Sequence, residues 1–406
     1  MIASHLKDTF AALQHPNYRL WFMGQLVSLI GTWMQSTAQG FLIFDLTHSA
    51  AFLGYVSFAS GIPTWLLTLY GGVIADRIPK RTLLIITQST MMVLASILAV
   101  LTFTHTVQPW HIIALAFMLG IANAFDMPGR QAFVAELVER KDLTNAIALN
   151  ATMFNLGVVT GPAVAGLVYA WLGPAWCFTI NAISFIAVIA ALLLMRIKVQ
   201  LRTDHMSPII ELKEGVKAAF SSDSMKLLFV SLFICSAFGF GILVLAPAWA
   251  VDVLHGNVTT NGLLLSARGV GSLISGLVLA TVASRGYRGK IWTLGSILLP
   301  ISVLLFGMAR WLPFSLLMIA FMGLSLIMVV NIANGLIQAN TSDEMRGRVM
   351  SIYALILAGG QTLGSLFMGL IADRINEPVA AFIGAGILGV LAIAIYLFKP
   401  FMRKIA

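Results

Sequence analysis

The sequence predicts an all-α membrane protein of twelve transmembrane helices, and three observations support this fold class. Of its 406 residues, 59% are hydrophobic and only 10% are charged, with a mean hydropathy of +0.92, whereas soluble proteins are about a quarter charged. A transmembrane helix and its loop take about 34 residues, so the chain accommodates about twelve of them. Four glycines also recur half a chain apart. These features exclude a soluble enzyme, a disordered chain and a free nucleic-acid binder.

Each predicted span is a long apolar run that ends at polar or turn-forming residues. A β-barrel fits poorly, because its strands alternate in short segments and runs such as 182–195 are apolar on every side. Before the first span, Leu6, Phe10 and Leu13 recur near helical spacing, so a short interfacial helix is expected there. The predicted spans are 20–45, 51–74, 83–104, 109–128, 143–171, 175–195, 226–253, 260–283, 291–309, 313–338, 345–372 and 379–398.

The two halves of the chain repeat one another. Gly120, Gly157, Gly161 and Gly166 reappear 203 residues later as Gly323, Gly360, Gly364 and Gly369. Such a repeat is typical of proteins built from two homologous helix bundles. The predicted parts are an N-terminal six-helix bundle (1–196), a cytoplasmic linker with a short amphipathic helix (197–225) and a C-terminal six-helix bundle (226–406).

The lysines and arginines gather in alternate loops, and this pattern predicts the orientation of the chain in the membrane. With both termini in the cytoplasm, only Arg310 and Arg374 of the 25 basic residues fall in outer loops, and Arg268 lies within a span. The net charge of +9 therefore reflects membrane topology. No nucleic-acid partner is expected.

A glycine, an acid and a basic cluster follow the second span, in the run Gly71-Gly72-Val73-Ile74-Ala75-Asp76-Arg77-Ile78-Pro79-Lys80-Arg81. This run resembles the signature loop between the second and third helices of the major facilitator superfamily. Pro79 stands where the family usually has glycine. The resemblance implies a major facilitator fold, in which two pseudo-symmetric six-helix bundles open alternately to the two sides of the membrane. The alternative is an ordinary basic loop.

The resemblance also implies a conformational latch between the halves. In the outward-open state Asp76 would dock on the N-terminus of the eleventh span, where the helix dipole favours an acid. Thr341 and Glu344 form a T-x-x-E pattern there, which predicts a capping box. The expected latch residues are Gly72, Asp76, Arg77, Lys80, Arg81, Thr341 and Glu344.

The fifth span carries Gly157, Gly161, Pro162 and Gly166, a pattern that resembles the antiporter motif of facilitator-family exporters. Small residues at this spacing also serve simple helix packing, which remains an alternative. The segments 126–133, 145–150 and 346–351 resemble the bacterial exporter branch that includes enterobactin exporters. Members of that branch carry drugs, siderophores and other metabolites, so the substrate stays open.

Charged residues inside a membrane are costly and are therefore candidates for function. Arg268 in the eighth span is predicted to bind an anionic substrate or to pair with an acid, and Asp252 and Asp45 are its expected partners. A structural ion pair or snorkelling is the alternative. Asp126 lies four residues before Arg130, a spacing that allows an ion pair on one helix face although Pro128 interrupts the helix. We favour a local pair over a proton site, with Lys80 or Arg81 as further partners.

Polar amides in the spans are candidate substrate contacts, although each one alone is more simply explained by hydrogen bonding between helices. Near Trp33 and Met34, an amide could combine polar and apolar contacts. The candidates are Gln25, Gln35, Gln39, Asn150, Asn155, Asn331, Asn334, Gln338 and Gln361.

Together these features predict a secondary active transporter that exports a small amphiphilic molecule, a drug-like compound or a siderophore, by alternating access. Proton antiport is expected from the family alone. The expected location is the bacterial inner membrane, where lipids and protons are partners beside the substrate. An importer or lysophospholipid carrier and a non-transporting sensor or scaffold are the alternatives. No catalytic activity, metal ion or cofactor is expected, because the sequence has no P-loop, no G-x-S-x-G and no metal-ligand spacing of histidines.

Overall fold

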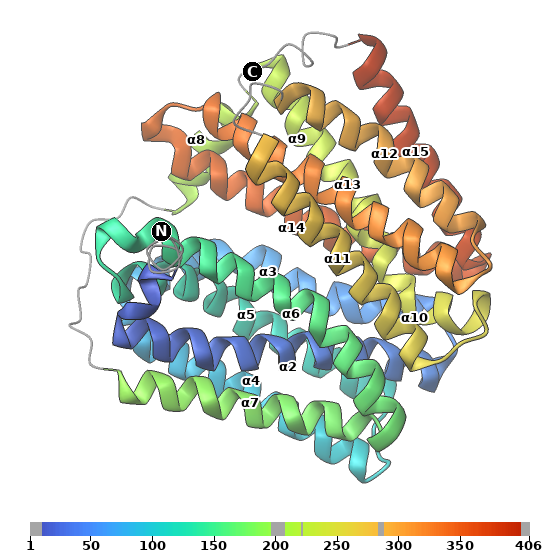
Figure 1. Cartoon of the computed structure of the whole chain (residues 1–406), viewed down its shortest axis with the longest axis horizontal. Coiled ribbons are helices and arrows are strands. Elements are labelled where there is room, and N and C mark those ends of the chain that lie inside the picture. Colours follow the sequence, from blue (N-terminus) through green and yellow to red (C-terminus); the bar gives the residue numbers. More distant parts are fainter. Residues whose placement is uncertain (1–9, 196–207, 221, 283–287, 399–406) are drawn as a thin grey trace, which may run out of the picture.

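Two groups of helices make up the protein. The computed structural model describes residues 10–195, 208–220, 222–282 and 288–398, and these contain helices and no strand. Figure 1 shows one group in blue to green and the other in yellow to red, close together at one end of the molecule and apart at the other. The predicted all-α fold class is confirmed.

The first group contains six long helices. Proline occupies the first position of three of them, where its fixed φ suits helix entry and its missing N–H leaves no bond unmade. The group packs mainly through α2 on α6 and α7, α3 on α5, and α4 on α5 and α7. Its helices are α2 (Pro16–Thr47), α3 (Ala50–Arg77), α4 (Lys80–Phe103), α5 (Pro109–Leu137), α6 (Leu143–Leu172) and α7 (Pro174–Leu194), with short 3₁₀ turns η1 (Ala11–Gln14) and η2 (Arg140–Asp142).

The second group packs mainly through α11 on α13, α12 on α13 and α15, and α14 on the turns that follow α9. The amphipathic helix α8 (Pro208–Ala219) precedes it, lies on α14 and falls within the predicted linker. The other elements are α9 (Asp223–Cys235), η3 (Ser236–Phe240), η4 (Gly241–Leu245), α10 (Ala246–Ala248), η5 (Trp249–Val253), α11 (Val258–Val282), α12 (Arg288–Met308), α13 (Leu312–Ala339), α14 (Asp343–Arg374) and α15 (Glu377–Phe398).

The seventh predicted span is not a uniform α-helix. It is helical from Asp223 to Val253, but η3 and η5 are π-helical and η4 is a 3₁₀ turn. Gly239 and Gly241 lie in these irregular turns and Pro247 follows them. Glycine lowers the cost of departing from α geometry and proline removes a backbone donor, so both favour an irregular helix here.

Eleven helices of the described chain are long and apolar enough to cross a membrane. Among the long helices that the structure describes, α2 is outside this set. It has 32 residues and is therefore long enough to span a membrane. Its buried glutamines, among them Gln25, Gln35 and Gln39, lower its hydropathy. The first predicted span, 20–45, is therefore the one of the twelve that stays a prediction.

The buried apolar residues form separate cores in the two groups. One cluster combines Trp249, Trp292 and Leu326 with many residues between 219 and 395, and Ala50 is its only described member from the first group. Three smaller clusters lie in the first group, where Ala248 is the one described core residue from the second. Two nearly independent cores support the proposed division into bundles 1–196 and 226–406.

The groups meet along two helix pairs, α3 with α14 and α6 with α11. The contacts begin where α3 starts and α14 ends, at Ala50 and Gly369, and extend to Trp65 and Gly359. We call this the closed end. At the opposite end of the same pair, no described atom outside its own helix lies within 4 Å of the place that a Cβ at Gly72 or Gly347 would occupy. We call this the open end.

Some predictions fall outside the described residues. Leu6, within the expected interfacial helix, belongs to the undescribed segment 1–9, and only η1 is seen before α2. The start of the predicted linker lies in the undescribed segment 196–207. The backbone of Asp76 lies in the last turns of α3, but its side chain is not described.

Candidate substrate cavity and charged network

A cavity of about 1000 Å³ lies between the first group and α14. It is walled mainly by α2, α3 and α5 on one side and by α14 on the other, and it reaches Gly72 and Gly347 at the open end. Its size is at the upper end of the range found for small-molecule sites. The cavity can therefore hold a molecule of drug or siderophore size.

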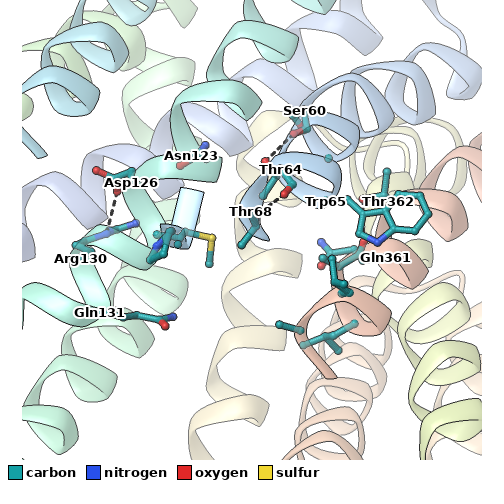
Figure 2. A pocket seen from close by; sticks show the side chains of 18 of the residues that line it. Ser60, Thr64, Trp65, Thr68, Asn123, Asp126, Arg130, Gln131, Gln361 and Thr362 are labelled. Carbon is teal, nitrogen blue, oxygen red and sulfur yellow. Dashed lines mark hydrogen bonds and ion pairs between the residues drawn. The ribbon is translucent and has the colours of Figure 1, made fainter. Parts of the chain in front are cut away.

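The cavity walls combine aromatic and polar side chains. Trp33, Trp65, Phe154 and Phe185 supply apolar surface. Figure 2 shows the polar part, with Ser60, Thr64 and Thr68 on α3, Asn123 and Gln131 on α5, and Gln361 and Thr362 on the far side. Apolar walls with a few polar groups are typical of sites for amphiphilic small molecules.

Asp126 is the charged centre of the cavity wall. Its side chain is fully buried, and its Oδ1 accepts hydrogen bonds from the Thr87 hydroxyl at 2.8 Å and from Gln88 Nε2 at 2.9 Å. Its Oδ2 lies 3.0 Å from Nε of Arg130, one helical turn further along α5 (Figure 2). The predicted i, i+4 pair is therefore present. The expectation that Pro128 interrupts the helix between the two residues is wrong, because α5 continues through it to Leu137.

The network is only partly satisfied. Nη1 of Arg130 lies 3.5 Å from Oε1 of Gln25 on α2, at the limit of a hydrogen bond. Nε2 of Gln25 and Oε1 of Gln88 are buried, and neither has a hydrogen-bond partner among the described residues. Buried polar atoms are normally paired. Of these two residues, Gln88 lines the cavity and is the one that a bound molecule can approach.

The basic residues of the signature loop do not join Asp126. Lys80 forms an ion pair with Glu136 near the end of α5, at 2.7 Å. Arg81 donates from Nε to the carbonyl of Leu192 at 2.6 Å and from a terminal nitrogen to that of Leu193 at 2.8 Å. The expectation that either residue extends the Asp126 pair is wrong, because both are held at the ends of neighbouring helices.

The second part of the predicted latch, Thr341 and Glu344, does not contact the described part of the signature loop 72–81 in this structure. The helix α14 has Ser342 as its N-cap, with no side-chain cap bond, and the Thr341 hydroxyl donates to the carbonyl of Ile337 at 2.7 Å. The predicted capping box is therefore wrong, because Ser342 is the N-cap and the Thr341 hydroxyl bonds back to α13 instead. Glu344 and Arg77 are exposed. No described hydrogen bond or ion pair joins residues 72–81 to 341–344.

The glycines of the antiporter-like motif serve two interfaces. Gly157 and Gly161 face α2, where a Cβ at Gly157 would lie 3.0 Å from Trp33 and one at Gly161 would collide with Trp33. Gly166 faces α11, and a Cβ there would lie 3.0 Å from Cα of Thr259. A Cβ at Gly262 of α11 would in turn collide with the carbonyl of Pro162. The motif thus packs α6 against both its own group and the other one.

Arg268 does not form the predicted ion pairs. Among the described residues, neither Asp252 nor Asp45 pairs with it, and its buried Nε has no hydrogen-bond partner. Its Cγ lies 3.2 Å from where a Cβ of Gly323 would be, because α11 and α13 pack backbone against backbone there. Asp252 and Asp45 were predicted as partners because they lie at the outer ends of spans. Arg268 instead lies on the face of α11 that packs against α13. Arg268, Asp252 and Asp45 are not part of the described cavity wall.

Of the predicted amides, Gln361 lines the cavity and the others are absent from its described wall. Gln35 accepts from Nδ2 of Asn181 at 2.6 Å, and both side chains are buried. Nε2 of Gln338 donates to Oδ1 of Asn334, one turn away, at 2.6 Å. These are bonds between or within helices. Asn331 is exposed, and Asn150 and Asn155 are half-buried.

Comparison with known proteins places this architecture in a family. A sequence model of the family described as transmembrane secretion effectors, within the major facilitator superfamily, matches residues 7–404. The chain belongs to this family. The transporter is 27% identical over 361 residues to the staphyloferrin A transporter of Staphylococcus aureus, covering 87% of this chain and 89% of the relative.

Two further comparisons agree. The transporter is 26% identical over 393 residues to the enterobactin exporter EntS of Shigella flexneri, covering 94% of this chain and 91% of that protein. The resemblance to enterobactin exporters is confirmed. A crystal structure of the nucleoside transporter NupG superposes with a TM-score of 0.76 at 15% identity, covering 94% of this chain and 99% of that one. This likeness confirms the major facilitator fold.

Several residues of the transporter's network were missed from the sequence. Thr87, Gln88 and Glu136 were not singled out. Thr87 and Gln88 interrupt an otherwise apolar stretch of α4, and that signal was available. Nothing in the sequence joined them to Asp126, because 38 and 39 residues separate them from it. Glu214 of α8, which pairs with Arg348 at the cavity wall, was missed for the same reason.

Proposed function

We propose that this transporter exports a small amphiphilic molecule, drug-like or siderophore, from the cytoplasm of a bacterium by proton-coupled alternating access. The observation that carries the proposal is a cavity that is open at one end of the α3–α14 pair and closed at the other. The charge pattern of the loops supports an inner-membrane location with cytoplasmic termini. The open end then faces the cytoplasm, where an exporter takes up its cargo.

The charges of the cavity wall bear on the class of cargo. Asp126, Arg130 and Arg348 are its charged residues among those described. Asp126, the one acid among them, forms an ion pair with Arg130, and Arg348 forms one with Glu214. A cationic cargo would find no unengaged acid on the described wall, whereas an anionic group can compete for Arg130. The wall therefore favours neutral or anionic amphiphiles, which the aromatic residues can hold.

Asp126 is the residue through which we propose proton coupling. Its ion pair with Arg130 stabilises the charged carboxylate, and loss of that partner leaves a buried acid, whose ionised form is unfavourable. Cargo binds while Asp126 is ionised and paired with Arg130. Protonation of Asp126 breaks the pair and favours release of the cargo. Cargo and proton thus exclude one another at this site, as antiport requires.

In the alternate state the open end would close. Gly72 would then meet α14 near Gly347, and Asp76 would approach the N-terminus of α14, with the pair Lys80–Glu136 holding the loop in place. Arg268 is kept as a candidate for coupling or cargo contact in that state, since it is a charge within a span. Asp252, Asp45 and the amides away from the cavity are lesser candidates of the same kind.

Reconstituted vesicles with an imposed pH gradient test the proposal. Three amphiphilic dyes of matched size, one neutral, one anionic and one cationic, report the class of cargo. We expect gradient-driven accumulation of the neutral or anionic dye and proton movement in the opposite direction. Flux without any response to the gradient would refute proton coupling. If the protein is folded and transports none of the dyes, a sensor or scaffold is favoured. If a dye and protons move in the same direction, an importer is favoured.

A further inference from the structure

A single carboxylate from the second group caps a helix of the first group at the closed end. Oδ1 of Asp373, in the last turn of α14, accepts from the hydroxyl of Ser49 and from the backbone N–H of Ala51 at 3.3 Å. Ser49 is the N-cap of α3 and makes no side-chain cap bond of its own. One of the orphan N–H donors at the start of α3 is thus satisfied across the interface, where an acid also suits the helix dipole.

A close backbone contact lies one turn before this cap. A Cβ at Gly369 would lie 2.8 Å from the carbonyl of Ala50 and 3.0 Å from Cα of Gly54. Only a residue without a side chain lets α14 and α3 approach this closely. Gly369 and Asp373 therefore act together, the glycine by permitting the approach and the acid by capping the helix that it meets.

The same seven-residue pattern occurs at both ends of the α3–α14 pair. Gly-x-Ile-Ala-Asp-Arg-Ile spans residues 72–78 at the end of α3 and residues 369–375 at the end of α14. The offset of 297 residues differs from the 203-residue repeat of the two halves, so this pattern is not part of that duplication. The two helices are packed together and run in opposite directions, so the two copies lie at opposite ends of one interface.

We infer that residues 369–375, together with Ser49 and Ala51, form an outer latch that holds the transporter in its present state. It is the counterpart of the inner latch proposed for Gly72 and Asp76. The outer latch is engaged, while the position of Gly72 opens into the cavity. One interface cannot be tight at both ends while the halves rock about its middle, so engagement of either latch releases the other. Asp373 is a positioning residue that sets which state is populated.

This inference rests on the proposed alternating access, and spin-label distances separate the two claims. A background with Cys177 and Cys235 replaced by alanine carries one label pair at each end of the molecule. Thr106 and Trp311 report the closed end, and Arg140 and Ala339 report the open end. All four are exposed. The variants are Asp373→Ala, Gly369→Val and the inner-latch variant Asp76→Asn.

The control is Asp223→Asn, another exposed acid at a helix end. Asp223 pairs within its own helix, with Lys226 at 3.4 Å, and no described bond joins it to the other half. Size-exclusion profiles show whether each variant is folded. If Gly369→Val fails to fold, Asp373→Ala alone decides, because it removes a surface cap and leaves the packing intact.

Removing Asp373 should raise the ratio of the outward-open to the present state about fivefold, the factor that corresponds to a helix cap of about 1 kcal/mol. The distance at the closed end should lengthen and that at the open end shorten, and Gly369→Val should act in the same direction. Asp76→Asn should act in the opposite direction. Unchanged distances in Asp373→Ala would overturn the outer latch even if transport proceeds. A single fixed distance in every variant, including Asp76→Asn, would overturn alternating access as well.

Discussion

Asp126 and Arg130 form a 3.0 Å ion pair one helical turn apart on α5, beside the cavity and within the membrane-length helix Pro109–Leu137. The acid is fully buried, whereas the arginine side chain is 26% exposed. Moving two charges out of water costs more free energy than burying two apolar side chains of the same size. A buried ion pair is therefore weak evidence that the residues serve stability alone. The exposed edge of Arg130 instead leaves the pair open to competition from a bound molecule.

Replacing Asp126 by asparagine should uncouple transport from protons. The amide keeps an acceptor for Thr87 and Gln88 but cannot take up a proton in this range, so dye efflux should no longer respond to the pH gradient. Downhill exchange of the dye should persist. The measurement is flux in vesicles with and without the gradient, with Asp223→Asn as the control. A variant that still concentrates dye against its gradient would show that the coupling residue lies elsewhere.

Replacing Arg130 should change the class of cargo. Arg130→Gln removes the positive charge at the wall, so binding of an anionic dye should weaken by roughly ten- to a hundredfold, as expected for a charge-assisted hydrogen bond of ~1.5–3 kcal/mol. A neutral dye of the same size should be affected little. Competition binding in detergent measures both. Equal weakening of the two dyes would contradict a role of Arg130 in recognising charge.

The glycine at 161 should be needed for packing. Gly161→Val would force its side chain into Trp33 and the backbone of α2, and overpacking of this kind costs about 1–3 kcal/mol. Gly276→Val is the matched control, since no described atom beyond its own helix lies within 4 Å of a Cβ at that site. Thermal unfolding in detergent should show a lower midpoint for the first variant only. A midpoint shared by both would contradict the packing argument.

The pair of Gln35 and Asn181 should contribute stability and little to cargo binding. Gln35→Ala removes a buried bond between α2 and α7 at 2.6 Å, and such bonds in membranes average about 0.6 kcal/mol. We therefore expect a small fall in the unfolding midpoint and unchanged dye affinity. A large loss of affinity with an unchanged midpoint would instead restore Gln35 as a cargo residue.

The sequence predicted most of the helices but few of the polar contacts, and the reason is geometric. Apolar runs set where a helix can span, so eleven of the predicted spans match membrane-length helices. Side-chain partners depend on how each helix is rotated toward its neighbours. The residue pattern of a single helix does not predict this rotation. Asp126 with Arg130 could be predicted because both lie on α5, whereas Thr87 and Gln88 come from α4.

Two wrong predictions have the same origin. Arg268 was assigned Asp252 and Asp45, acids at the outer ends of two other spans, as partners, but its helix faces α13 at Gly323. The capping box at Thr341 was inferred from spacing alone, whereas this residue follows the end of α13 and its hydroxyl bonds back to the carbonyl of Ile337. Local patterns predict which residues can interact, and packing decides which of them do.

The most direct test of alternating access is the accessibility of one cavity residue from each side of the membrane. Thr64→Cys, in a chain without Cys177 and Cys235, places a thiol in the cavity wall. An impermeant maleimide should label it from the cytoplasmic side in the resting transporter, and from the outer side once cargo and a proton gradient are supplied. Labelling from one side only, under every condition in which the protein transports, would contradict the account.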